Sequence, residues 1–148
     1  MEHYEERLKM GGWEEELWYS AYQVGCLQQR LGMAWMLVLS RYLEAYQLRP
    51  TRAEPLFRIA KFYRESGQYR LALLFAGAAM HIPVPDDLLF IERSVYESDL
   101  PLEYAQCCSH LGLQQEAVDA VRPVLRDGSE HGKIVAARWD NAPYHRAR

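Results

Sequence analysis

Apolar residues recur along this chain at helical spacing. From about residue 14 to residue 127 they return every three or four positions, and no run of four or more residues alternates cleanly as a strand does. Three glycines interrupt the pattern in similar settings, each between two amphipathic stretches: Gly32, Gly67 and Gly112. Glycine suits the left-handed residue that ends a helix. The pattern therefore predicts an all-α chain of helix hairpins with these glycines at the turns.

The clearest predicted hairpin spans residues 53–86. Its first helix carries large apolar residues around one alanine, its second helix carries three alanines, and Pro83 and Pro85 end it. Small residues let two helices approach closely, and large neighbours fill the space around them. The residues expected at the helix contacts are Leu56, Ile59, Ala60, Tyr63, Tyr69, Ala72, Ala76 and Ala79.

Weaker copies of this hairpin precede and follow it, at about residues 19–52 and 98–127. The spacing from Gly67 to Gly112 is about 11 residues longer than one such unit of ~34 residues. The extra residues, 86–97, are predicted to form a loop or an extension of the next helix, and Asp99 is predicted to be the N-cap before Pro101. The tail, 128–148, is expected to hold a short helix around residues 132–139 and then a mobile or packed end. Residues 1–10 are interpreted as the last turns of another repeat.

The order of large, small, aromatic and glycine positions resembles the tetratricopeptide repeat (TPR). This resemblance implies one domain, residues 1–148, folded as a TPR-like right-handed superhelix of antiparallel helix hairpins. A closer resemblance rests on the string RPTRAEPL at residues 49–56 and on the segments at residues 42–48, 62–67, 72–76, 89–92 and 95–97. These residues are similar to a helical-repeat region that follows the catalytic domain in some bacterial family 2 glycosyltransferases. The similarity covers about residues 10–125 and implies an accessory helical module. The transferase domain of that class is an α/β fold with an Asp-x-Asp metal motif, and this chain has no such motif.

Composition and charge exclude several classes of function. Of the 148 residues, 49% are hydrophobic and 25% charged, a balance typical of a folded globular domain rather than a disordered chain. The net charge of −3 disfavours a dedicated nucleic-acid binder, which would carry a basic excess. The longest apolar run, residues 33–39, is far shorter than the ~20 residues of a membrane span. Three cysteines and a charged opening segment predict reduced thiols, no secretory signal and a cytoplasmic location.

The first helices of stacked hairpins line a concave groove, which is the candidate binding site. The sequence predicts an apolar floor flanked by a basic cluster on the middle first helix, and this combination suits a short peptide with acidic and apolar residues. The predicted groove residues are Leu27, Arg30, Phe57, Arg58, Lys61, Arg64, Leu102 and Gln106. The alternative is a solvated helix face carrying i,i+4 ion pairs such as Lys61–Glu65. The positions matching the clamp that TPR grooves use for C-terminal carboxylates hold Gln23, Leu27, Arg58, Asp99 and Glu103, which disfavours that clamp.

Two further groups of residues have competing interpretations. Arg49, Arg52 and Glu54 lie in the predicted turn between the first two hairpins. They could form an anion site at a helix N-terminus, but a turn held by Arg–Glu hydrogen bonds, which sets the stacking of the hairpins, is favoured. The pair at residues 86–87, two aspartates, is predicted to cap or precede a helix rather than to bind a metal.

The clustered thiols and the imidazoles have a chemical alternative to packing. Cys107, Cys108 and His110 lack the third group that would activate a nucleophile, and Cys108 falls on the predicted core face. Their spacing to His131 does not indicate zinc. The four tryptophans at residues 13, 18, 35 and 139 are interpreted as packing residues, and no catalytic residue, metal or cofactor is predicted.

Together these patterns favour a non-catalytic interaction or scaffold module that binds a protein or peptide with acidic character on its concave face. Two other functions stay open: an accessory helical fragment of a glycosyltransferase system, and, less favoured, a small-molecule-binding domain or thiol enzyme using Cys107 and Cys108. Because the ends of a short repeat stack expose apolar surface, a homodimer through one end is also compatible with the sequence.

Overall fold

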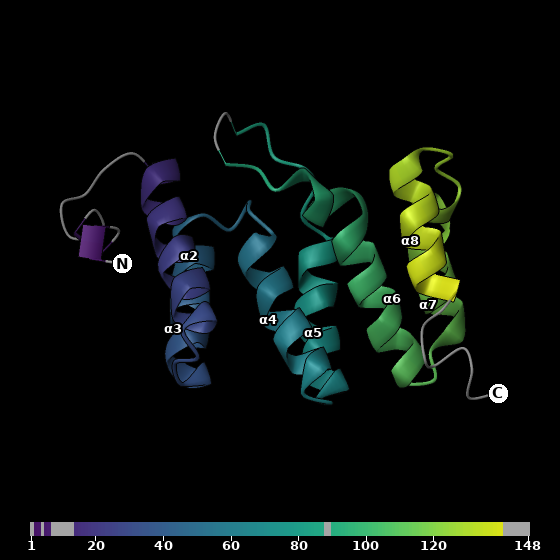
Figure 1. The fold of residues 1–148 in the computed structure, drawn as a ribbon, viewed down its shortest axis with the longest axis horizontal. Coiled ribbons are helices and arrows are strands. Elements are labelled where there is room, and N and C mark those ends of the chain that lie inside the picture. Colours follow the sequence, from purple (N-terminus) through teal and green to yellow (C-terminus); the bar gives the residue numbers. More distant parts are fainter. Residues whose placement is uncertain (1, 4, 7–13, 88–89, 141–148) are drawn as a thin grey trace.

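The chain is all-helical in the computed structural model, which describes residues 2–3, 5–6, 14–87 and 90–140 and contains no strand among them (Figure 1). The order of elements is α2 (Glu14–Arg30), α3 (Trp35–Leu48), α4 (Glu54–Glu65), α5 (Tyr69–Met80), the π-helical η1 (Val95–Asp99), α6 (Leu100–His110), α7 (Gln114–Leu125) and α8 (Glu130–Asp140). None of the helices in these ranges is both long and apolar enough to cross a membrane.

The helices pair into three consecutive hairpins, α2–α3, α4–α5 and α6–α7. Neighbouring hairpins join through α3 on α4 and through α5 on α6, so the three stand side by side along the long axis of the molecule (Figure 1). Helix α8 packs on α7 at the C-terminal end. The turns contain Gly32, Gly67 and Gly112 with φ of +70°, +76° and +79°. The sequence prediction of left-handed glycines at these turns is therefore confirmed.

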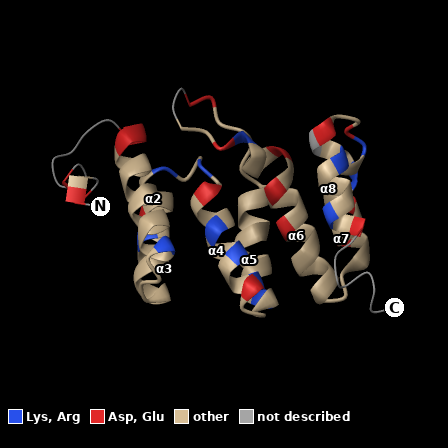
Figure 2. Ribbon diagram, in the orientation of Figure 1, with Lys and Arg blue, Asp and Glu red and all other residues tan. Residues whose placement is uncertain are grey.

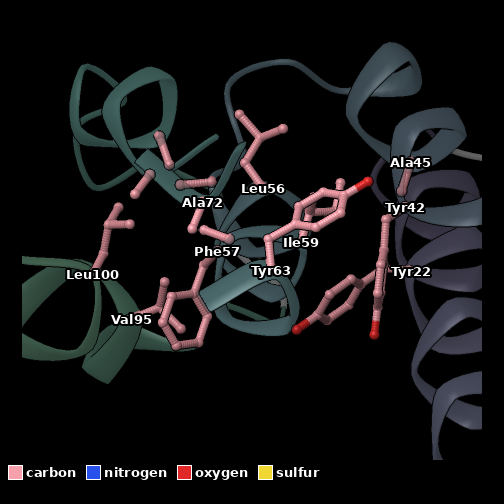
Figure 3. Close-up of a cluster of buried hydrophobic side chains, with 14 of the residues drawn as sticks. Tyr22, Tyr42, Ala45, Leu56, Phe57, Ile59, Tyr63, Ala72, Val95 and Leu100 are labelled. Atoms are coloured by element: carbon pink, nitrogen blue, oxygen red, sulfur yellow. The ribbon is translucent and has the colours of Figure 1, made fainter. Parts of the chain in front are cut away.

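The core of the middle hairpin follows the predicted alternation of small and large residues. Ala60, Ala72, Ala76 and Ala79 are fully buried. Large side chains fill the space around them, including Ile59 of α4, together with Leu56, Phe57 and Tyr63 (Figure 3). Of the predicted contact residues, Tyr69 alone is only partly buried. Close approach at alanines with aromatic and aliphatic fill is thus the physical basis of this hairpin.

Gly25 has a packing role in the first hairpin. A glycine inside a helix costs up to about 1 kcal/mol relative to alanine. Here a Cβ on Gly25 would lie 2.8 Å from the ring of Tyr42. The missing side chain lets the buried Tyr42 ring of α3 lie directly against α2.

The segment between α5 and η1 corrects one prediction and refines another. Residues 82–87 and 90–92, the crossing segment, are not helical, whereas helix resumes at residue 93 and runs through η1 into α6. The predicted loop and the predicted helix extension therefore both occur. Asp99 is not an N-cap: its φ of −65° and ψ of −42° lie inside the continuous helix. Proline lacks an N–H and crowds the preceding turn, and the wider π-helical turn of η1 accommodates Pro101 without ending the helix.

The two ends of the chain were predicted in outline only. Helix α8 confirms the short helix expected around residues 132–139. The expected mobile or packed end, residues 141–148, lies outside the described residues. Most of residues 1–10, interpreted as the end of another repeat, lies outside them as well.

Candidate functional site

Two adjoining cavities run along the first helices of the three hairpins. The first, about 580 Å³, lies mainly between α2 and α4, and the second, about 360 Å³, lies mainly between α4 and α6. Arg58, Lys61 and Glu92 line both cavities. The two cavities therefore form one groove along α2, α4 and α6, and these three residues mark its middle.

Most of the predicted groove residues line these two cavities. The second cavity is lined by Phe57, Arg58, Lys61, Arg64, Leu102 and Gln106, and the first by Arg30, Arg58 and Lys61. Leu27 is partly buried and lines neither cavity. The predicted apolar floor is therefore shorter than expected, because only two of its three residues, Phe57 and Leu102, line the groove, both between α4 and α6.

The basic cluster on α4 is matched by acidic residues, which the sequence interpretation underestimated. Arg58 Nη2 lies 3.2 Å from a carboxylate oxygen of Glu92. Arg64 forms an ion pair with the buried Glu103 of α6. Figure 2 shows the basic positions along α4 and acidic positions on η1 and α6. Burial raises the pKa of Glu103, and the nearby Arg64 opposes that shift.

Of the four predicted groove cations, Lys61 and Arg30 are more exposed than Arg58 and Arg64. Lys61 Nζ lies 4.0 Å from Glu65, four residues later on the same helix, and both side chains are about half exposed. This contact confirms the predicted i,i+4 pair, and a pair so exposed contributes only a few tenths of a kcal/mol. Arg30 ends α2 and is exposed, with no ion pair to another described residue. A ligand could therefore contact both cations with little loss of folding free energy.

A second polar cluster lies at the turn before α4. Arg52 donates from Nε and Nη2 to the Glu54 carboxylate over 3.2 and 2.5 Å, and both side chains are fully buried. The guanidinium of Arg52 lies 3.8 Å from the centre of the Trp18 ring. The favoured interpretation, a turn held by Arg–Glu hydrogen bonds, is confirmed.

Asp87 completes this cluster, and the prediction that it caps or precedes a helix is wrong. It caps no helix and instead accepts hydrogen bonds from Arg49 over 2.5 and 2.9 Å and from Arg52 over 3.0 Å. The hydroxyl of Tyr96 donates to Glu54 and accepts from the Ala53 N–H. Three charge-assisted hydrogen bonds from two guanidiniums hold this carboxylate, and the next described helical residue is 93, too far along the chain for Asp87 to cap that helix. Nothing in the sequence pairs Asp87 with residues more than thirty positions earlier.

The two adjacent thiols of α6 are closed off from solvent. Cys107 and Cys108 are both fully buried, and burial with the nearby Glu103 carboxylate raises the pKa of Cys107 to about 12. The imidazole of His110 stacks on the Tyr69 ring at 4.0 Å. A neutral buried thiol is a poor nucleophile. Within the described part of the chain, no group of three or more His, Cys, Asp or Glu residues is placed to hold a metal ion.

No protein-family model, curated protein or solved structure matches this chain. The functional argument therefore rests on the chain's own residues. The groove and the buried cluster are connected through the crossing segment, because Asp87 belongs to the cluster and Glu92 lines the groove.

Proposed function

We propose that this chain is a TPR-like, non-catalytic module that binds an extended segment of a protein partner in the groove along α2, α4 and α6. The observation that carries the proposal is the pair of adjoining cavities that share Arg58, Lys61 and Glu92. A stack of hairpins in which each contacts only its neighbours presents its first helices on one face, and extended binding surfaces of this kind suit peptides.

The lining of the groove supports a peptide rather than a compact apolar ligand. Most of the residues that line each cavity are polar or charged. Their lining combines cations, carboxylates and the amides of Gln23, Gln29 and Gln106. An extended peptide presents backbone donors and acceptors that such side chains can satisfy, whereas small-molecule sites are mostly apolar with few polar groups.

The exposed cations indicate the preferred charge of the partner. Arg58 and Arg64 already contact Glu92 and Glu103. Reversing either charge would break contacts inside the fold, and any loss of binding would then be ambiguous. Lys61 and Arg30 avoid this problem, and acidic partner side chains near them would gain long-range attraction.

The experiment that tests this function starts from peptides selected by phage display on the wild-type protein. Their affinities are then measured by fluorescence anisotropy for wild type, for Arg30→Glu/Lys61→Glu and for a control, Arg70→Glu/Arg126→Glu. The control reverses two exposed charges outside the groove lining and changes the net charge equally.

We expect the groove variant to bind at least about tenfold more weakly, a change of ~1.4 kcal/mol, and the control to stay within about twofold of wild type. Equal losses in both variants would show that only net charge matters. Unchanged affinity of the groove variant would show that the peptides bind another face, and it would overturn the proposal.

A further inference from the structure

The tip of the crossing segment, residues 90–92, lies over the middle of the groove. The ring of Phe90 stacks on Tyr19 of α2, with ring centres 3.8 Å apart. The carboxylate of Glu92 accepts hydrogen bonds from the Tyr22 hydroxyl over 2.7 Å and from Arg58 Nη2 over 3.2 Å. The tip thus seats one aromatic ring and one carboxylate on α2 and α4, where the two cavities meet.

The tip and the base of this segment differ in how firmly they are held. At the base, Asp87 bonds Arg49 and the fully buried Arg52. At the tip, about a third of each of the Glu92 and Arg58 side chains is exposed, and Phe90 is 46% exposed. The Phe90 backbone has φ of +59°, which side-chain-bearing residues rarely adopt. The side chains at the tip are therefore accessible, although the Phe90 oxygen and the Glu92 N–H bond Arg52 and Glu54 of the buried cluster.

The groups under the tip form a receptor for a carboxylate. Burial raises the pKa of Tyr22 well above its ordinary value, so its hydroxyl keeps its proton and can donate. Arg58 Nε–H donates to the same hydroxyl oxygen over 3.0 Å, which leaves Nη2 directed at Glu92. One neutral donor and one guanidinium are thus fixed around a carboxylate position in an accessible groove.

We propose that Glu92 is an intramolecular occupant of this subsite, and that an acidic side chain of the bound partner replaces it on Arg58 and Tyr22. An aromatic or large apolar residue two positions before that acidic residue would take the place of Phe90 on Tyr19. This inference rests on the proposed function and specifies its partner: an extended peptide with an aromatic-x-acidic sequence. A competing internal group lowers apparent affinity by the fraction of molecules whose subsite is free.

The test uses two peptides, acetyl-FIERS-amide, a copy of residues 90–94, and acetyl-FIQRS-amide, which lacks the carboxylate. Each is titrated into ¹⁵N-labelled wild type, into Phe90→Ala/Glu92→Ala (the vacated variant), which removes both side chains of the tip, and into the same variant with Arg58→Gln. The Arg58 Nε–H resonance reports occupancy of the subsite directly. Glu97→Gln, an exposed charge neutralisation outside the groove lining, is the control for net charge.

We expect the vacated variant to bind the glutamate peptide at least about fivefold more tightly than wild type and Glu97→Gln do. It should prefer the glutamate peptide to the glutamine peptide by a similar factor, and Arg58→Gln should abolish the preference. Equal affinity of wild type and the vacated variant, equal affinity for the two peptides, or no binding at all would each overturn the inference.

Single Glu92→Ala, which keeps Phe90, gives the same comparison if the double variant unfolds. Failure of this inference is distinguishable from failure of the proposed function. Binding of display-selected peptides to the wild type would still depend on Lys61 and Arg30 if Glu92 were only structural.

Discussion

The crossing segment carries two Arg–carboxylate contacts in very different surroundings. At its base, Arg52 and Glu54 are fully buried, and Asp87 is nearly so. At its tip, Arg58 and Glu92 are each about one-third exposed. The same chemical pair is therefore closed to water at one end and open to it at the other, and the cost of separating two charges depends on whether water can replace the partner.

At the base, the charged groups of Arg52 and Glu54 make further hydrogen bonds besides their ion pair. Arg52 also donates to the backbone oxygen of Phe90 over 2.6 Å and stacks on Trp18. The Glu54 carboxylate also accepts hydrogen bonds from the Tyr96 hydroxyl and the Glu92 N–H. Buried charges persist when their hydrogen-bonding capacity is used, and removing one partner leaves the others desolvated and unpaired.

The strongest test of this contrast is Arg52→Met. It leaves the carboxylates of Glu54 and Asp87 without their shared guanidinium, and we expect the free energy of unfolding to fall by about 3–5 kcal/mol. Urea unfolding followed by circular dichroism measures the change. Arg52→Lys keeps the charge but not the two-pronged geometry, and it should recover only part of the loss.

The matched control for this variant is Arg58→Met at the tip. We expect it to lower the free energy of unfolding by no more than about 1 kcal/mol, because water can reach Glu92 once the guanidinium is gone. Equal losses at the two positions would contradict the distinction between base and tip.

A smaller effect is expected for Asp87→Asn, which weakens the base without removing a guanidinium. Hydrogen bonds to charged groups contribute about 1.5–3 kcal/mol, and we expect a loss in that range at pH 7. The guanidinium groups of Arg49 and Arg52 hold the pKa of Asp87 below its ordinary value of 3.8. Its contribution to stability is therefore present above about pH 3.8 and is lost as pH falls through the lower pKa of the folded state.

Unfolding free energies of wild type and Asp87→Asn at pH 7 and at pH 2.5 measure this dependence. The difference between the two proteins should shrink in acid. A difference that stays constant with pH would mean that Asp87 acts through its shape rather than its charge.

The sequence predicted what depends on local pattern. Glycine at a left-handed turn and alanine at a close helix contact are local requirements, so Gly67 and Ala72 could be recognised from their neighbours. The lining of the groove followed from helical spacing, and six of its eight predicted residues line the cavity between α4 and α6.

The contacts that could not be predicted join distant parts of the chain. Asp87 lies 38 residues from Arg49, and Glu92 lies 34 residues from Arg58. Hydrophobic periodicity does not predict the path of an irregular segment. The contacts of the crossing segment with α2 and α4 could therefore not be predicted from the sequence. Asp99 was misassigned because Pro101 is an ordinary signal for a helix start, and that signal does not reveal a preceding π-helical turn.

The smallest expected effect belongs to Glu92→Gln. Glutamine can still accept hydrogen bonds from Tyr22 and Arg58, and the pair it replaces is about one-third exposed, so the free energy of unfolding should change by less than about 1 kcal/mol. Local order should respond more than global stability. Amide hydrogen exchange at residues 90 and 91 should accelerate, while exchange at the buried Ala53 N–H, which bonds the Tyr96 hydroxyl at the base, stays unchanged. Exchange that accelerates equally at tip and base would mean that the segment opens as one unit, and Glu92 would then be part of the anchor rather than a group that a partner can replace.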